Sequence, residues 1–163
     1  MHKIISNASP LIGLCSISLL HILKELWNEI IIPEAVYREV VINGSGKPGA
    51  SVIAEACHKW ITVSSVKNMQ VTQVLRALLD EGESEVIALG QEINADMLLL
   101  DNREPRLFAS AINLNVIGTV GIIKLAWHKG LIKEPAEEIY RLRDKGFWIS
   151  NSLIEQIKKE MGR

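Results

Sequence analysis

The sequence predicts an α/β fold, namely a three-layer α/β/α sandwich with a central parallel sheet of four to five strands. Four short apolar runs have the length and composition of buried parallel strands, and they cover residues 3–6, 29–32, 97–101 and 115–118. Segments of helical period lie between these runs. This alternation is the βαβ order of a parallel sheet with helices on both faces.

Composition fits this fold and limits the function classes. The chain has 163 residues, of which 48% are hydrophobic and 23% charged, so we expect a globular protein. The net charge of −1 gives no overall attraction to nucleic acid, so any basic surface must be local. Cys15 and Cys57 stand far apart, and we expect free thiols in a reducing compartment. The apolar start lacks a signal-cleavage pattern, and no stretch approaches the ~18 apolar residues of a membrane span. We therefore expect a cytoplasmic protein without membrane contact.

Helices are expected wherever apolar residues recur at helical spacing. The first is expected to be capped by Ser18 and to end near Trp27, and the second to start with Pro33 in its first turn. A flexible loop should follow over residues 43–49. The second helix is expected to cover residues 33–42. Further helices are expected over residues 50–58, 71–79, 82–93, 103–112, 120–128 and 134–143, with a last one from a Ser150 or Asn151 cap to residue 160.

The chain is expected to divide into a main α/β domain over residues 1–132 and a helical extension over 133–163 that packs on the same domain. In the extension, Phe147 and Trp148 fit three roles. They could form a short edge strand, contact a second subunit, or close the core.

Polar residues follow three of the expected strands. Asn7 and Ser9 follow the first, Asp101 and Asn102 the third, and Thr119 the fourth. Ligands of open parallel sheets bind beyond the carboxyl ends of the strands, so we expect a site at this edge. Polar turns at strand ends are the alternative explanation.

Two helices add carboxylates to the same edge. The helix from Gly82 precedes the third run and runs antiparallel to it, so its first turn should lie near Asp101. Glu83 and Glu85 are two residues apart and cannot face the same way, so at most one should be a ligand. A favourable interaction with the helix dipole is the alternative. Glu39 borders the apolar face of its helix, where a carboxylate needs a partner such as a cation. The alternatives are that Glu39 reaches solvent, or that it pairs with Arg38 or a distant lysine.

Together these residues predict a cation site made of oxygen atoms. Asp101, Glu83 and Glu39 suit Mg²⁺ or Mn²⁺, which activate water and neutralise the charge of a phosphate. Arg103 and Arg106 are three residues apart on the next helix, so both could bind a phosphate backbone, although a solvated helical face would look the same.

Five motifs occur in one order along the chain. They are I-S-N-A-S-P-L-I at 5–12, P-E-A-V-Y-R-E-V-V at 33–41, E-G-E-S-E-V-I-A-L at 81–89, L-L-L-D-N-R at 98–103 and G-T-V-G at 118–121. With them, residues 3–132 resemble the PIN-domain superfamily, close to VapC-type toxins, whose members usually begin S-D-[TA]-S-P-L. Such proteins are metal-dependent endoribonucleases, often dimeric, and often held inactive by a small antitoxin.

The resemblance implies a role for each site residue. It puts the metal ligands at Asn7, Glu39, Glu83 (or Glu85 in a competing alignment) and Asp101, and the supporting polar residues at Ser9, Asn102 and Thr119. The family has Asp at the position of Asn7, and often at that of Asn102. An amide oxygen can coordinate a cation but brings no negative charge, so these two positions should weaken metal binding.

The sequence thus predicts a Mg²⁺- or Mn²⁺-dependent endoribonuclease of PIN type, the toxin of a toxin–antitoxin pair, attenuated by Asn7. The alternative is a catalytically weak or inactive PIN-fold module that binds RNA or a protein. A third reading is a metal-dependent phosphatase or a nuclease that acts on DNA. The partners implied are RNA, a small antitoxin and a second copy of the chain.

Overall fold

The computed structural model describes residues 2–162 and contains one parallel sheet. The strands lie in the order β3-β2-β1-β4-β5, and every neighbouring pair is parallel. Their bounds are β1 Ile4–Ser6, β2 Ile30–Pro33, β3 Ile61–Ser64, β4 Met97–Leu99 and β5 Val116–Ile117. The predicted fold class, an α/β sandwich with a parallel sheet of four to five strands, is confirmed.

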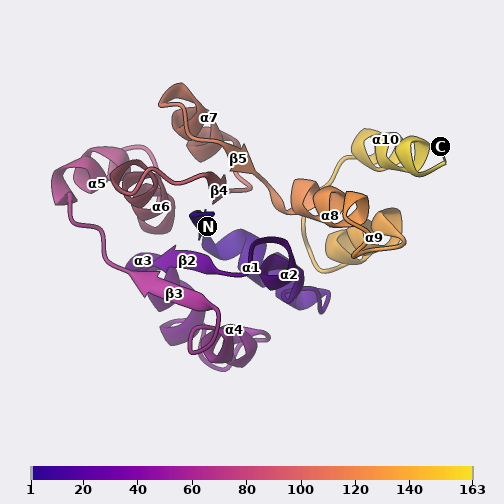
Figure 1. Ribbon diagram of the computed structural model, residues 1–163, viewed down its shortest axis with the longest axis horizontal. Helices are drawn as coiled ribbons and strands as arrows, with labels where there is room; N and C mark the ends of the chain where they lie inside the picture. The colour runs from indigo at the N-terminus through magenta and orange to yellow at the C-terminus, as the bar shows by residue number, and fades with distance from the viewer. Residues whose placement is uncertain (1, 163) are drawn as a thin grey trace.

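The helices fill the connections between the strands. Their bounds are α1 Ala8–Ser16, α2 Ile22–Trp27, α3 Glu34–Tyr37, the π-helical turn η1 Arg38–Ile42, α4 Ala50–Ala56, α5 Met69–Arg76, α6 Glu81–Glu92, α7 Arg103–Ala111, α8 Thr119–His128, α9 Pro135–Asp144 and α10 Asn151–Met161. Figure 1 shows α5 and α6 on one side of the strands and α1 and α2 on the other, which gives the three layers.

The strand order reverses between β1 and β4. From β1 the chain moves outward to β2 and β3, then returns through α5 and α6 to place β4 on the other side of β1. The carboxyl ends of β1 and β4 therefore face a topological switch point, where open α/β sheets bind their ligands. Asn7 follows β1, and Asp101 lies two residues beyond β4.

The core lies on both faces of the sheet, and α6 contributes many of its buried residues. Every residue from Gly82 to Gly90 is buried. Gly90 allows α6 to approach the sheet closely, because a Cβ there would lie 2.8 Å from a methyl group of Leu98 in β4. The first turn of α6 is thereby held firmly at the carboxyl edge of the sheet.

Several expected elements differ in the structure. β3 was not expected, and only Ile61 of its four residues is buried, so its sequence lacks the apolar run of the other strands. α1 was also not expected; Pro10 lies in its first turn, where proline is tolerated. Ser18 caps no helix but has a φ of 61° in the turn before α2. Pro33 ends β2 and precedes the helix.

The C-terminal helices pack on the rest of the chain. α9 contacts α8 and α1, and α10 contacts α9 (Figure 1). Ile139, Leu142, Ile154 and Ile157 from these two helices are buried in the common core. Ser150 caps α10, as expected, by accepting a hydrogen bond of 3.2 Å from the backbone N–H of Leu153. No helix within residues 2–162 is long and apolar enough to span a membrane.

Candidate metal and nucleic-acid site

Three strand ends meet at the carboxylate of Asp101. Ser9, in the first turn of α1, donates a hydrogen bond of 2.6 Å to Oδ2. Thr119, the first residue of α8, donates to the same oxygen from its hydroxyl at 2.8 Å and to Oδ1 from its backbone N–H at 2.7 Å. The carboxylate is thus fixed in one orientation by residues that follow β1 and β5.

Asn7 lies at the centre of the same edge. Its backbone N–H donates to the carbonyl oxygen of Leu99 at 3.1 Å, which extends the pairing of β1 with β4. Its side chain is 6% exposed, and its Oδ1 is buried without a hydrogen-bond partner among residues 2–162. An unsatisfied buried acceptor costs about 1–3 kcal/mol, so such an atom calls for a ligand.

Gly82 lets Asn7 and Glu39 approach the start of α6. A Cβ at this position would lie 3.0 Å from Oδ1 of Asn7 and 3.4 Å from Oε1 of Glu39. Both oxygens therefore lie beside one point of the helix backbone. A larger residue at position 82 would press directly on the two oxygens.

Glu83 holds the first turn of α6 and reaches Asn102. One of its carboxylate oxygens accepts a hydrogen bond from the backbone N–H of Asp80 at 3.2 Å, and Asp80 in turn accepts from the backbone N–H of Glu83 at 2.7 Å. This is a capping box. The other oxygen of Glu83 accepts a hydrogen bond of 2.7 Å from the side-chain amide of Asn102. Glu83 is thereby tied to the end of β4.

The carboxyl group of Glu39 has a raised pKa. Partial burial is the largest cause, followed by the negative charges of Asp80 and Glu83. Glu39 is an exposed residue, but Oε1 of its side chain lies beside Gly82, as described above. A cation beside these carboxylates would remove the repulsion that raises the pKa.

Glu85 has a different set of partners. It accepts a hydrogen bond of 3.0 Å from the backbone N–H of Ala35 and lies 3.5 Å from Arg76 and 3.9 Å from Arg38. None of these groups contacts Glu83. The two glutamates therefore face different surroundings, and Glu83 is the one next to Asn102.

The donor set is made only of oxygen, with an amide at its centre. Within the described part of the chain, no three His, Cys, Asp or Glu side chains are grouped so that they could hold a metal ion. Glu39, Glu83 and Asp101 therefore do not form such a group in this structure, and the oxygen that lies beside Glu39 is the amide oxygen of Asn7. This unpartnered Oδ1, between β1 and α6, is the atom that fits a hard divalent cation. The oxygen atoms of Asn7 and Glu39 are thus of the kind that suits Mg²⁺ or Mn²⁺, and they carry less negative charge than a pair of acids would.

A groove of about 570 Å³ runs beside this edge. Ser9, Asp101 and the exposed Arg103 and Arg106 are among the residues that line it. Its other residues are Asn102, 116–121, Phe147, Trp148, Ile149 and Leu153. Both arginines therefore line the same groove as Asp101.

Three features of the site were not expected from the sequence. Asp80 adds a negative charge beside Glu39, and Gly82 allows the close approach. The pattern Asp80-x-x-Glu83 before an apolar helix is a capping-box signal and could have revealed the first of them. Nothing in the sequence around Phe147 and Trp148 indicated that these two residues line a groove next to Asp101.

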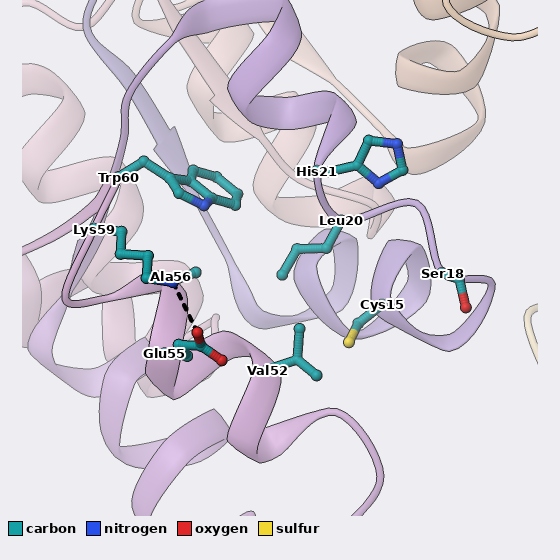
Figure 2. Close-up of a pocket in the computed structure, with 9 residues that line it drawn as sticks. All are labelled: Cys15, Ser18, Leu20, His21, Val52, Glu55, Ala56, Lys59 and Trp60. Atoms are coloured by element: carbon teal, nitrogen blue, oxygen red, sulfur yellow. Dashed lines mark hydrogen bonds and ion pairs between the residues drawn. The ribbon is translucent and has the colours of Figure 1, made fainter.

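A second pocket, of about 410 Å³, lies elsewhere (Figure 2). Cys15 from the end of α1, Val52 from α4 and Trp60 from just before β3 line it, so it is at the opposite end of α1 from Ser9. Figure 2 shows its one acid, Glu55, paired with Lys59 at 2.7 Å. Burial raises the pKa of the Cys15 thiol. This pocket shares no residue with the site around Asp101.

A protein-family model described as "DUF3368: PIN domain" matches residues 3–163. The match extends past residue 132, where the segment with the motif resemblance ends. No curated protein matches the chain.

Proposed function

The chain belongs to the PIN-domain family, and from this premise we propose that it is a Mg²⁺- or Mn²⁺-dependent endoribonuclease. The observation that carries the proposal is the buried Oδ1 of Asn7, which lacks a partner among residues 2–162 and lies beside the same point of α6 as Oε1 of Glu39. A divalent cation is a natural ligand for two such oxygens.

In this proposal Asn7, Glu39, Glu83 and Asp101 hold the cation. The bound ion supplies a nucleophile at neutral pH and neutralises charge on the phosphate. Ser9 and Thr119 keep the Asp101 carboxylate turned to one orientation through their hydrogen bonds. Glu83 rather than Glu85 is the proposed ligand, because Glu85 is already paired with Arg76 and Arg38.

The substrate is held by charge along the groove. Arg103 and Arg106 start α7 immediately after Asp101 and Asn102, so a phosphate bound to them lies next to the proposed metal ligands. Arginine suits this role because its planar group binds phosphate through two hydrogen bonds. The net charge of −1 makes this local pair the main attraction for RNA.

We further propose the setting that the motif resemblance implies. The chain would act as the toxin of a toxin–antitoxin pair, pair with a second copy of itself, and be inhibited by a small antitoxin. Light scattering on the purified chain tests the dimer. Co-purification with the product of the adjacent gene tests the antitoxin.

The second candidate function is a weakly active or inactive PIN-fold module that binds RNA or a protein. Two observations favour it. The Asn102 amide already satisfies Glu83 without a cation, and no acid-only metal group is found within residues 2–162. In this case the carboxyl edge of the sheet binds but does not cleave.

Cleavage assays separate the two candidates. The natural chain, Asn7→Asp and Asp101→Asn are each incubated with RNA, DNA and a simple phosphate ester, in Mn²⁺ and in EDTA. The nuclease proposal expects RNA cleavage only in Mn²⁺, more in Asn7→Asp, and none in Asp101→Asn. If neither the natural chain nor Asn7→Asp cleaves RNA, the nuclease proposal is wrong and the binding module remains.

A further inference from the structure

Trp148 is the most exposed large hydrophobic residue of the described chain, at 88%. Its neighbours anchor it from both sides. Ile149 is buried in the core at 9% exposure. The ring of Phe147 packs on α1, where Gly13 makes room for it, because a Cβ at Gly13 would lie 2.5 Å from Cζ of that ring. The backbone between two anchored residues therefore holds the indole out in solvent.

The indole lies on the wall of the groove that leads to Asp101. Arg103 and Arg106 line the same groove, and neither forms an ion pair with any residue from 2 to 162. Gly118 lies between Arg106 and Asp101, since a Cβ there would lie 3.1 Å from Nη1 of Arg106 and 3.1 Å from Oδ1 of Asp101. An aromatic face, two unpaired cations and Asp101, one of the proposed metal ligands, thus line one groove.

We propose that Trp148 is a stacking platform for one base of a single-stranded RNA, whose phosphates bind Arg103 and Arg106 and whose backbone passes over Gly118 to Asp101. The identity of the nucleic acid and the cleavage step rest on the proposed function. The binding mode does not, because it needs only the aromatic face and the two cations.

The composition of the groove favours a single strand over other occupants. Grooves for single-stranded nucleic acid combine positive charge along the backbone with aromatic side chains on which bases stack. A duplex keeps its bases stacked on one another and cannot offer a face to the indole. Trp and Arg are also common in protein interfaces. Here the same groove contains Asp101, one of the proposed metal ligands, which favours a nucleic-acid strand over a protein.

The test measures RNA binding in EDTA, so that no cleavage occurs. An unstructured, fluorescently labelled RNA is titrated with the natural chain, Trp148→Leu and Trp148→Phe. Val74→Ala is the control, since Val74 is 72% exposed on α5 and lies outside the groove. We expect Trp148→Leu to bind about 5- to 100-fold more weakly, from the usual contribution of one stacked base. Trp148→Phe keeps an aromatic face and should retain most of the affinity.

Two further readouts come from the same samples. RNA should quench the tryptophan fluorescence of the natural chain but much less that of Trp148→Leu, which keeps the three other tryptophans. Binding of a fully paired RNA duplex should be equal in all variants. Light scattering should give the same mass for the natural chain and Trp148→Leu.

The proposal is overturned if Trp148→Leu binds single-stranded RNA as tightly as the natural chain, or if the substitution changes the mass in solution, which would make the indole part of a protein interface. These results are distinct from failure of the proposed function. Cleavage by the natural chain with unchanged binding by Trp148→Leu removes only the stacking role. Weak binding by Trp148→Leu in a chain that never cleaves removes only the nuclease.

Discussion

The side-chain amide of Asn102 donates a hydrogen bond of 2.7 Å to Oε2 of Glu83 and so joins the end of β4 to the first turn of α6. The family whose motifs the chain resembles often has Asp at the position of Asn102. Two carboxylates in contact repel each other unless a cation lies between them. The amide removes that repulsion, so the pair is stable in the apo protein.

Restoring the acid at position 102 should therefore make stability depend on metal. Asn102→Asp is expected to lower the free energy of unfolding by about 1 kcal/mol in EDTA, because an attraction becomes a repulsion at a partly exposed site. Mn²⁺ should return most of the loss. Urea unfolding in EDTA and in Mn²⁺ measures both values.

Asn102→Ala is the matched control for this prediction. It loses the hydrogen bond to Glu83 but adds no charge, so Mn²⁺ should not restore its stability beyond the gain of the natural chain. Equal stability of Asn102→Asp and Asn102→Ala in both buffers would contradict the account of this pair.

Glu39→Gln should stabilise the metal-free protein at neutral pH. Partial burial and then the charges of Asp80 and Glu83 raise the pKa of Glu39 in the folded state. The folded chain therefore binds a proton more tightly there than the unfolded chain, whose glutamate has a pKa of about 4.3. The stability linked to that proton is present below the unfolded pKa and is lost as the pH rises through the folded pKa.

The expected gain from Glu39→Gln is modest, about 0.5 kcal/mol at pH 7, because the site is screened by water. Below about pH 4 the variant and the natural chain should be equally stable, since Glu39 is then protonated in both states. Unfolding in EDTA across this pH range measures the difference. A gain that is largest at low pH would have the wrong sign and would contradict the prediction.

Thr119→Val should lower kcat strongly and lower the free energy of unfolding only slightly. The substitution keeps the shape of a buried side chain and the backbone hydrogen bond, but removes the hydroxyl that holds Oδ2 of Asp101. Loss of a group that orients a metal ligand typically costs about 10- to 100-fold in activity. Thr72→Val is the control. This buried threonine of α5 donates to the carbonyl oxygen of Asn68, four residues earlier, and makes no hydrogen bond to Asp101.

Both threonine variants should lose about 1 kcal/mol of stability from the missing hydrogen bond. Only Thr119→Val should lower kcat in Mn²⁺. A similar loss of kcat in Thr72→Val would mean that reduced stability, rather than the orientation of Asp101, explains the effect.

Arg103→Ala and Arg106→Ala should each weaken RNA binding and lessen its dependence on salt. Each phosphate contact that is lost lowers the slope of log K against log salt by about 0.7 for a single strand. Arg141→Ala is the control, because Arg141 lies on α9 and pairs with Glu138 at 2.8 Å. An unchanged slope in both groove variants would remove the two arginines from the RNA site.

The parallel sheet could be predicted because its central strands are almost entirely apolar. β1 and β4 are buried on both faces, so their sequences stand out from the polar segments around them. β3 lies at the edge of the sheet, and Thr62 and Val63 are exposed, so its sequence carries no such run. α1 was missed because its small residues and Pro10 hide the helical period.

The sequence predicted which residues belong to the candidate site, but it could not predict the contacts between their side chains. Strand ends and helix starts placed Asp101 and Glu83 at one edge of the sheet from the sequence alone. The hydrogen bond from Asn102 to Glu83 and the unpartnered oxygen of Asn7 depend on side-chain positions set by the packing of α6. Trp148 belongs to a segment without regular structure, whose position follows from the docking of Phe147 on α1.

The central claim is that Asn7, Glu39, Glu83 and Asp101 hold one divalent cation. Calorimetric titration of Mn²⁺ into the natural chain, Asn7→Asp and Asp101→Asn tests it most directly. The account predicts one ion per chain, at least about tenfold tighter binding in Asn7→Asp because it adds a charged ligand, and loss of binding in Asp101→Asn. Absence of binding by both the natural chain and Asn7→Asp, or equal binding by all three proteins, would contradict it.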